Sequence, residues 1–180
     1  MTTDTDAQTV WAGKYLSVRK KGTWEYAERI GSIAAAVIVA IDGEGQLLLV
    51  EQYRVPLGRT CLELPAGLVG DETAGESIAD AARRELEEET GYHAATIEER
   101  GTFYSSPGMT SEAFTLVVAT GLTRTGDGGG DADENIVVHR VALEAVEGFV
   151  ADKRRAGVAI DAKMLLLLGG GLLAEISGRE

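Results

Sequence analysis

The feature that most constrains this chain is a run of carboxylates at the end of a segment with a helical pattern. The run reads Glu85-Leu86-Glu87-Glu88-Glu89. At about 100° per residue, three of these carboxylates fall within an arc of roughly 100° on one helix face, whereas Glu87 points the other way. Like charges at these spacings repel by roughly 0.2–0.5 kcal/mol per pair. The helix macrodipole adds to this cost because the run lies near the negative, C-terminal end.

Two interpretations fit these carboxylates. One is an exposed, solvated helix face, which is the usual reason for a run of glutamates. The other is a bound divalent cation, whose charge would turn the repulsion into attraction. Magnesium takes hard oxygen ligands, keeps several waters and commonly shares substrate phosphates. Under the second interpretation, Glu85, Glu88 and Glu89 are candidate metal ligands.

The same segment is predicted to form a helix over residues 74–90. Thr73 is the expected N-cap, and Glu76 lies three residues further on, which is capping-box spacing. Gly91 is well placed to end the helix. Apolar residues recur with the helical period at Ile78, Ala81, Ala82 and Leu86. This stripe predicts that one face of the helix packs on the core.

Elsewhere short strand patterns alternate with turns, and two further helical patterns follow. Strands are predicted at residues 15–20, 23–29, 32–41, 46–54, 61–64, 95–104, 113–120 and 136–141, and helices at 143–155 and 160–173. Residues 1–9 are polar and expected to fray, and residues 121–133 form a loop too rich in Gly and Asp to pack. This order of elements predicts an α+β fold with a mixed β-sheet.

Composition excludes several classes of partner. With 29 acidic against 17 basic residues the formal net charge is −12, so we expect no nucleic acid, and a phosphate-bearing ligand would need cations to mediate its binding. The single cysteine, Cys61, excludes an internal disulfide and fits a reducing compartment. No apolar run approaches the roughly 20 residues that span a bilayer. We therefore expect a cytoplasmic protein with no membrane segment.

The wider pattern around the carboxylates is more specific. Gly70, Glu76, the pair Arg84-Glu85, the pair Glu88-Glu89 and Gly91 recur at fixed spacings. Residues 70–92 thereby resemble the full Nudix box. The resemblance implies an α/β/α sandwich and a hydrolase that splits a nucleoside diphosphate linked to another group, with Mg²⁺ (or Mn²⁺) held by the box.

The resemblance also assigns roles to individual residues. It implies that Glu85 and Glu89 are the principal metal ligands, and that Glu88 assists the metal or its water. Arg84 would orient the carboxylates, and Glu76 would brace the box. The main-chain carbonyl of Ala66 would join the metal shell.

Features outside the box resemble the ADP-ribose pyrophosphatase branch of the family. They are Glu51-Gln52-Tyr53-Arg54, Leu62-Glu63-Leu64-Pro65-Ala66-Gly67 and Ser105-Ser106-Pro107-Gly108, with Pro107 sixteen residues past Gly91. The resemblance covers roughly residues 13–165. It implies cleavage of ADP-ribose to AMP and ribose 5-phosphate. Two alternatives stay open: another nucleoside diphosphate sugar such as GDP-mannose, and a nucleotide-binding regulator that does not cleave.

Several polar residues of these motifs are candidates for substrate binding. Gln52 and Arg54 are two residues apart on a strand and so share a face. There Arg54 could grip a phosphate or ribose oxygen and Gln52 could bind the same ligand, unless both are solvated groups at a sheet edge. Glu63 could support either the metal or the ligand. Pro107 and Gly108 belong to the motif that marks the branch.

The N-terminal region is expected to contribute to the base site and to a homodimer. Tyr15 and Trp24 resemble the two adenine-stacking aromatics of the branch, although either residue could simply pack in a core or dimer. The resemblance implies that the strands of residues 1–30 cross to the other subunit. Residues 31–180 would then form the hydrolase domain.

The residue that activates water is expected on a loop beyond the box. The resemblance points to Glu134, which follows the glycine-rich residues 126–133. Glu112 is the competing candidate. Glu134 could also be an ordinary loop carboxylate.

Overall fold

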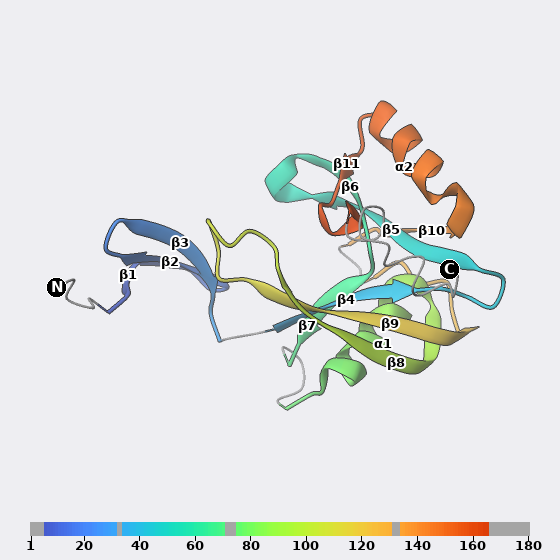
Figure 1. Cartoon of the computed structure of the whole chain (residues 1–180), viewed down its shortest axis with the longest axis horizontal. Helices are drawn as coiled ribbons and strands as arrows, with labels where there is room; N and C mark the ends of the chain where they lie inside the picture. The colour runs from blue at the N-terminus through green and yellow to red at the C-terminus, as the bar shows by residue number, and fades with distance from the viewer. Residues whose placement is uncertain (1–5, 32–33, 71–74, 131–133, 166–180) are drawn as a thin grey trace.

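The computed structural model describes residues 6–31, 34–70, 75–130 and 134–165. Within these ranges lie three β-sheets, helices α1 (Ile78–Thr90) and α2 (Val146–Arg155), and the short 3₁₀ helices η1 (Val55–Leu57) and η2 (Leu143–Ala145). Two of the sheets lie between α1 and α2, and the third extends to one side (Figure 1). No helix in these ranges combines the length and apolarity needed to cross a membrane.

The body of the molecule is built from two four-stranded sheets, with the orders β7-β4-β9-β8 and β10-β5-β6-β11. In each, one pair is parallel (β4 with β9, and β6 with β11) and the other pairs are antiparallel. The prediction of one mixed sheet is therefore incomplete. The two sheets part at residues 42–45, where β4 and β5 share only the bridge between Ile41 and Leu47. The strands are β4 (Ala34–Ala40), β5 (Gln46–Arg54), β6 (Arg59–Glu63), β7 (Ala66–Val69), β8 (Tyr92–Tyr104), β9 (Ala113–Arg124), β10 (Val137–Ala142) and β11 (Ala159–Ile160).

The apolar run of β4 joins the layers because successive side chains of a strand point to opposite faces. Ile38 is fully buried in a cluster that includes Leu86 of α1. Its neighbour Val37 belongs to a second cluster, which includes Leu62 of β6 and Val150 of α2. One continuous strand thus contributes to the packing of both helices. This arrangement confirms the predicted α+β class.

Helix α1 begins at Ile78, so the predicted start at residue 74 is wrong. Ser77 is the N-cap: its Oγ accepts a hydrogen bond from the Asp80 backbone N–H at 3.1 Å and donates to the Asp80 carboxylate at 2.7 Å. Just upstream, Gly75 has a φ of +83°, which ends any helical backbone there. The expected cap, Thr73, lies outside the described residues.

Other boundaries also differ from the prediction, and each difference comes from long-range pairing. Strand β1 (Gln8–Ala12) forms where fraying was expected, because it pairs with β2 (Leu16–Lys21). Strand β7 was missed, and it pairs with β4. Strand β11 begins where the last helix was expected, because it pairs with β6; of that helix, residues 166–173 lie outside the described residues. The loop predicted at residues 121–133 is strand to Arg124, and its glycines contact α1.

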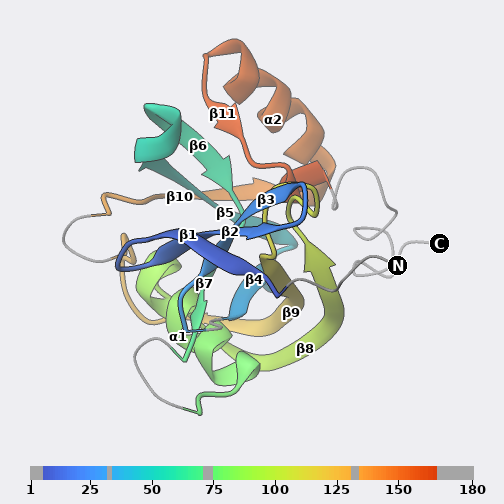
Figure 2. The same ribbon diagram turned by 90° about the vertical axis from the view of Figure 1, so that its left-hand side faces the viewer.

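The N-terminal sheet, β1-β2-β3, projects from the body and is fastened to it through β3 (Trp24–Arg29). Figure 2 looks onto this end, with the sheet in front of the body. The Ala27 backbone N–H donates to the Met109 carbonyl at 2.9 Å, and the Ser111 N–H donates to the Ala27 carbonyl at 3.1 Å. Arg29 forms an ion pair with Glu112 at 2.9 Å. These contacts connect the projecting sheet to the segment that follows β8.

The turn between the two sheets depends on Asp42. One carboxylate oxygen accepts the backbone N–H groups of Glu44 and Gln46 at 2.9 and 3.0 Å, and the other accepts Arg140 Nε at 3.0 Å. Burial acts to raise the pKa of this carboxyl, but the hydrogen bonds from Gln46, Arg140 and Glu44 outweigh it and hold the pKa below its usual range. Asp42 thus ties the β4–β5 turn to β10.

We expect Asp42→Asn to lower the free energy of unfolding by about 1–3 kcal/mol at pH 7, because it removes a charge-assisted bond and turns an amide toward Arg140. The stabilisation is present above the unfolded-state pKa of about 3.9 and is lost as the pH falls through the lowered folded-state pKa. The difference between wild type and variant should therefore shrink in urea titrations near pH 3. Glu44→Gln, at an exposed residue that also pairs with Arg140, is the control and should change stability little. A constant difference across this pH range would contradict the assignment.

Candidate active site

A cavity of about 380 Å³ opens beside α1. It is lined by residues that come from both main sheets, from α1 and from the segments around it. The predicted site residues that it brings together are Gln52, Arg54, Glu63, Ala66, Arg84, Glu85, Glu88, Glu89, Glu112 and Glu134. Residues distant in sequence therefore meet at the carboxylate face of one helix.

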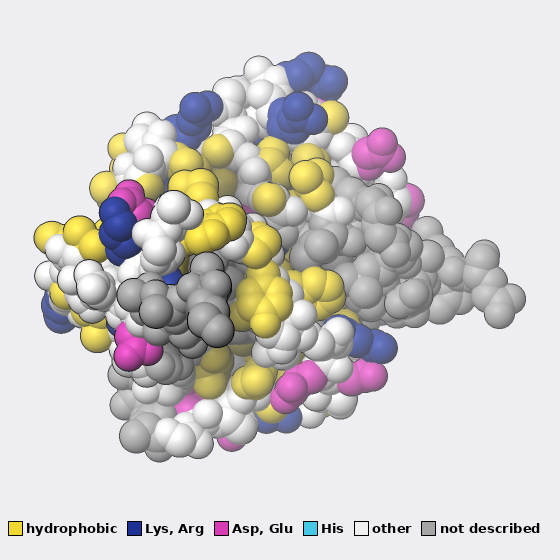
Figure 3. Space-filling view, turned by 60° about the vertical axis from the view of Figure 1, so that its left-hand side comes forward, with side chains coloured by type: hydrophobic (Ala, Val, Ile, Leu, Met, Phe, Trp, Pro, Cys, Tyr) yellow, Lys and Arg dark blue, Asp and Glu magenta, His cyan; other side chains and the backbone are white. Residues whose placement is uncertain are grey.

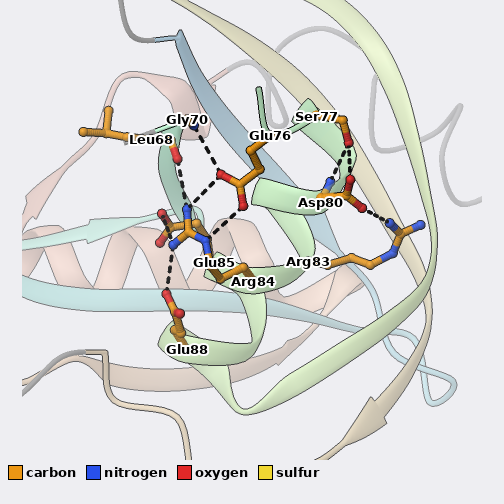
Figure 4. Close-up of polar contacts among 9 residues, drawn as sticks. All are labelled: Leu68, Gly70, Glu76, Ser77, Asp80, Arg83, Arg84, Glu85 and Glu88. Atoms are coloured by element: carbon orange, nitrogen blue, oxygen red, sulfur yellow. Dashed lines mark hydrogen bonds and ion pairs between the residues drawn. The ribbon is translucent and has the colours of Figure 1, made fainter. Parts of the chain in front are cut away.

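Arg84 is the centre of the polar contacts on this face (Figure 4). Its Nη1 donates to Glu85 Oε1 at 3.0 Å and to Glu88 Oε2 at 3.1 Å. Its Nε donates to Glu76 Oε1 at 3.2 Å, and its Nη2 donates to the Leu68 carbonyl at 3.2 Å. Hydrogen bonding to Glu76 is the largest of the causes that raise the pKa of this guanidinium. One cation therefore offsets the repulsion among carboxylates and links α1 to β7.

Glu76 has the bracing position expected from the box, although it does not cap the helix. Its Oε2 accepts the Gly70 backbone N–H at 3.2 Å while its Oε1 accepts Arg84. The bond from Arg84 is the main cause of a lowered pKa at Glu76. Glu76 therefore connects the segment before α1 to the middle of the helix.

Glu89 is the buried member of the carboxylate group, with 4% of its surface exposed. Its Oε2 accepts the Ala66 backbone N–H at 3.0 Å. Burial raises the pKa of this carboxyl to about 8, and the nearby charges of Glu85 and Glu134 act in the same direction. A carboxylate this disfavoured in its charged form gains strongly from a nearby cation.

Glu85 reaches the cavity across a residue that has no side chain. A Cβ built at Gly67 would lie 1.8 Å from Glu85 Cδ and 2.1 Å from its Oε1. Only glycine at this position leaves room for the carboxylate. The backbone of β7 thereby forms one wall of a cradle for Glu85.

Glu85, Glu88 and Glu89 all line the cavity, and their carboxylate oxygens are of the hard kind that fits a divalent metal ion. Within the part of the chain that the structure describes, no three acidic, histidine or cysteine side chains are gathered at ligand spacing. The Arg84 guanidinium bonds both Glu85 and Glu88. The buried Glu89 and the cradle at Gly67 are the observations that favour a cation at this site.

Opposite α1, Arg54 and Glu63 form a bidentate ion pair, with Nε–Oε1 and Nη2–Oε2 distances of 2.7 and 2.8 Å. Gln52 is buried next to them and lines the same cavity. In the pairing of β5 with β6, Glu63 is opposite Val50 and Gln52 is opposite Cys61, so Gln52, Arg54 and Glu63 share one face of the sheet. This polar wall can bind ligand oxygens through Arg54 and Gln52.

The two candidates for activating water differ in their partners. Glu134 lines the cavity close enough to Glu89 to raise its pKa. Glu112 accepts Arg29 Nε at 2.9 Å and Ser105 Oγ at 3.1 Å. The Glu112 carboxylate thus takes part in holding the N-terminal sheet.

The cavity also contains residues that the sequence did not indicate. Arg29 reaches it through the ion pair with Glu112. Lys163 reaches it from the segment after β11 and pairs with Asp161 at 2.5 Å. An arginine or lysine outside a recognisable motif gives no local signal of a site.

The expected base-stacking residues lie outside this cavity. Trp24, Pro107 and Gly108 line a second hollow of about 490 Å³ between the N-terminal sheet and the segment after β8. Tyr15 lines neither hollow; it is exposed, with Lys14 Nζ 4.8 Å from its ring centroid. The structure therefore brings Trp24 together with Pro107 and Gly108, and it leaves Tyr15 apart.

Comparison with known proteins agrees with this geometry. The profile of the NUDIX domain matches residues 31–166. The chain belongs to the Nudix family. A crystal structure of an ADP compounds hydrolase has the same fold, with a TM-score of 0.75 and 24% identity over 99% of this chain and 96% of that one. Nudix hydrolases generally use divalent metal ions.

Several curated relatives carry substrate names, and the following two differ in the substrate named. An ADP-ribose pyrophosphatase of Bacillus subtilis (strain 168) is 39% identical over 111 residues, which are 61% of this chain and 58% of the relative. A GDP-mannose pyrophosphatase of Cronobacter sakazakii (strain ATCC BAA-894) is 35% identical over 143 residues, 74% of this chain and 70% of the relative. The chain spans 49% and 64% of the length of two other relatives.

We expect Gly67→Ala to weaken Mn²⁺ binding by roughly 10–100-fold, the size typical of disturbing the support of a metal ligand. The new methyl group displaces the Glu85 carboxylate, which is the flexible end of a side chain, so the thermal midpoint should change little. Isothermal titration with Mn²⁺ measures the effect. Gly148→Ala in α2, where a Cβ meets nothing within 4 Å, is the control. Unchanged Mn²⁺ affinity in Gly67→Ala would show that Glu85 is not a ligand.

Proposed function

We propose that this protein hydrolyses the pyrophosphate bond of ADP-ribose, giving AMP and ribose 5-phosphate, with Mg²⁺ (or Mn²⁺) as cofactor. The observation that carries the proposal is the single cavity in which the box carboxylates face Gln52, Arg54 and Glu63. Glu85, Glu88, Glu89 and the Ala66 carbonyl would hold the metal. Bound there, it would neutralise the pyrophosphate charge and acidify a water.

The chain's own residues would bind the substrate and orient it and the attacking water. Arg54 is held in place by Glu63 and presents its remaining N–H groups to a phosphate or ribose oxygen. Gln52 hydrogen-bonds the same ligand from the next inward position of β5. Glu134 accepts a proton from the attacking water or orients it, and Arg84 keeps the box carboxylates in register. Catalysis of this kind consists mostly of positioning and electrostatics.

A second candidate substrate is GDP-mannose, which the name of the relative from C. sakazakii favours. Stacking on an aromatic side chain accepts every base, so Trp24 with Pro107 and Gly108 would bind guanine as well as adenine. A nucleotide-binding regulator is less well supported, since Glu85, Glu88 and Glu89 are all present.

We expect purified protein with Mg²⁺ or Mn²⁺ to cleave ADP-ribose faster than GDP-mannose, ADP-glucose or NADH, as measured by product release. Equal rates on GDP-mannose would remove the first choice of substrate. Binding of ADP-ribose without turnover, with either metal supplied, would favour the regulator. Removal of the metal with EDTA should abolish turnover, and added Mg²⁺ or Mn²⁺ should restore it.

Glu88→Gln should lower kcat on the order of 100-fold, as expected for losing one group that stabilises charge in the reaction. Glu87→Gln is the matched control: the two side chains lie on the same helix and are 43% and 46% exposed, but Glu87 pairs with His93 instead of lining the cavity. Similar rates for the two variants would contradict the metal assignment.

The exposed apolar residues of the N-terminal sheet support a homodimer, which would bring Trp24 or Tyr15 of one protomer to the cavity of its partner. Val10, Trp11, Tyr15, Leu16 and Trp24 are all exposed. Figure 3 shows hydrophobic side chains on the side of the molecule where this sheet projects. Such a patch is typical of an interface.

Val10→Asp should therefore convert a dimer to a monomer in analytical ultracentrifugation, because it places a charge in the exposed apolar patch that the dimer would bury. Val55→Asp on η1 is the control, since Val55 is also exposed (80% against 61% for Val10) but distant in the chain from the sheet. A monomeric wild type at micromolar concentration would contradict the homodimer.

Cys61 agrees with a reducing location but does not define it. The thiol is buried, and burial raises its pKa to about 12, so it stays protonated and poorly reactive. A cytoplasmic location is proposed on this basis and on the absence of any other cysteine from the sequence.

A further inference from the structure

A glycine-rich segment, residues 126–130, lies against the C-terminal end of α1. The Gly129 N–H donates to the Glu89 carbonyl at 2.9 Å, and the Gly130 N–H donates to the Glu88 carbonyl at 3.0 Å. The Gly126 N–H donates to the Gly91 carbonyl at 3.1 Å. The last carbonyls of a helix have no partner within the helix. This segment therefore caps the helix at Glu88 and Glu89, two of the residues whose side chains line the cavity.

The approach of the two backbones is close enough to require glycine. A Cβ built at Gly128 would lie 2.4 Å from the Thr90 carbonyl carbon and 2.7 Å from the Glu89 oxygen. A Cβ at Gly91 would lie 2.4 Å from the Gly126 oxygen. Gly91 and Gly128 also have φ values of +74° and +67°. The glycine content of residues 121–133, from which we expected a loop that does not pack, thus permits this contact.

The same segment contacts Glu134. A Cβ built at Gly130 would lie 2.2 Å from Glu134 Oε2, 2.8 Å from Ile136 Cδ1 and 3.1 Å from Glu134 Cβ. The Gly129 carbonyl accepts the Ile136 N–H at 3.0 Å. Gly129 is thus bonded to α1 through its N–H and to the start of β10 through its carbonyl. In the sequence, Glu134 lies between Gly129 and Ile136, the two residues that this second bond joins. Its side chain lines the cavity together with those of Glu88 and Glu89.

We propose that the segment 126–130 is a positioning element, which sets the Glu134 carboxylate at a fixed place relative to Glu88 and Glu89 by capping α1. Gly130 is the positioning residue for Glu134, and Gly128 is the residue that admits the segment to the helix end. The proposal rests on the proposed function in one respect, that Glu134 acts on the water. Its structural part, the cap, does not depend on the substrate.

Two properties follow from this geometry. The N–H groups of the segment offset the negative end of the helix dipole, where the carboxylates lie. In addition, the main chain that carries Glu88 and Glu89 is hydrogen-bonded to the segment that contacts Glu134. The water-activating group and the metal-holding groups are thus placed by one backbone framework rather than by separate loops.

The test combines Gly130→Ala with Glu134→Gln. Gly130→Ala adds a methyl group where Glu134 now lies, so we expect kcat for ADP-ribose to fall at least tenfold, while KM and Mn²⁺ affinity change less than about threefold. The double variant should be no slower than Glu134→Gln alone, because both changes remove the same contribution. Gly45→Ala is the matched control: its φ of +74° is close to the +70° of Gly130, and a Cβ there meets nothing within 4 Å.

Three results in the single and double variants would overturn the proposal, and a fourth would come from the control. The three are full kcat in Gly130→Ala, losses that multiply in the double variant, and full kcat in Glu134→Gln, which would leave no catalytic group to position. A loss of kcat in Gly130→Ala no larger than that in Gly45→Ala would also overturn it, because backbone strain alone would then explain the loss.

Amide hydrogen exchange separates this inference from the choice of substrate. In wild type the Gly129 and Gly130 amides should be protected, and in Gly128→Ala they should exchange at least tenfold faster. Exchange of these wild-type amides at the rate of a free peptide would overturn the cap whatever the activity. Protection together with no cleavage of ADP-ribose would contradict the proposed substrate and support the cap, and Gly130→Ala would then be compared with wild type on GDP-mannose.

Discussion

The contacts of one guanidinium, that of Arg84, make the carboxylate face of α1 possible. Charge-assisted bonds to Glu76, Glu85 and Glu88 offset a repulsion that would otherwise work against the helix. The bond to the Leu68 carbonyl fixes the same guanidinium to β7, so the helix face is held in register with the sheet. Lysine, with one compact ammonium group, does not have the planar fork that reaches these partners at once. The cavity wall formed by α1 depends on this residue.

The C-terminal end of α1 needs a second compensation, which the glycines supply. The buried Glu89 lies where the helix dipole is unfavourable to anions, and its pKa is raised as a result of burial. Backbone N–H groups of residues 126–130 satisfy the carbonyls there and bring Glu134 to the same wall. The compensation is made by main-chain atoms and needs no particular side chain. It does require residues without a Cβ where the two backbones come close, as at Gly128.

The sequence predicted what depends on local pattern and missed what depends on distant partners. The apolar stripe of α1, its end at Gly91 and the β5 strand were predicted correctly because period and turn residues determine them. Strands β7 and β11 were missed, since pairing across the chain defines them. The predicted start of α1 was wrong because Ser77 caps the helix and Gly75, with a positive φ, precedes it. Arg29 and Lys163 enter the cavity through tertiary contacts, and no spacing in the sequence could have indicated them.

The charge balance of the cavity argues for metal dependence without reference to any relative. Six carboxylates line it, from Glu63, Glu85, Glu88, Glu89, Glu112 and Glu134, against four cations, from Arg29, Arg54, Arg84 and Lys163. Each of these cations already has an acidic partner: Glu112, Glu63, the box glutamates and Asp161, respectively. A pyrophosphate that entered this cavity alone would meet net negative charge. The four cations can orient such a ligand, but balancing its charge takes cations from solution, which the proposed metal site on α1 would hold.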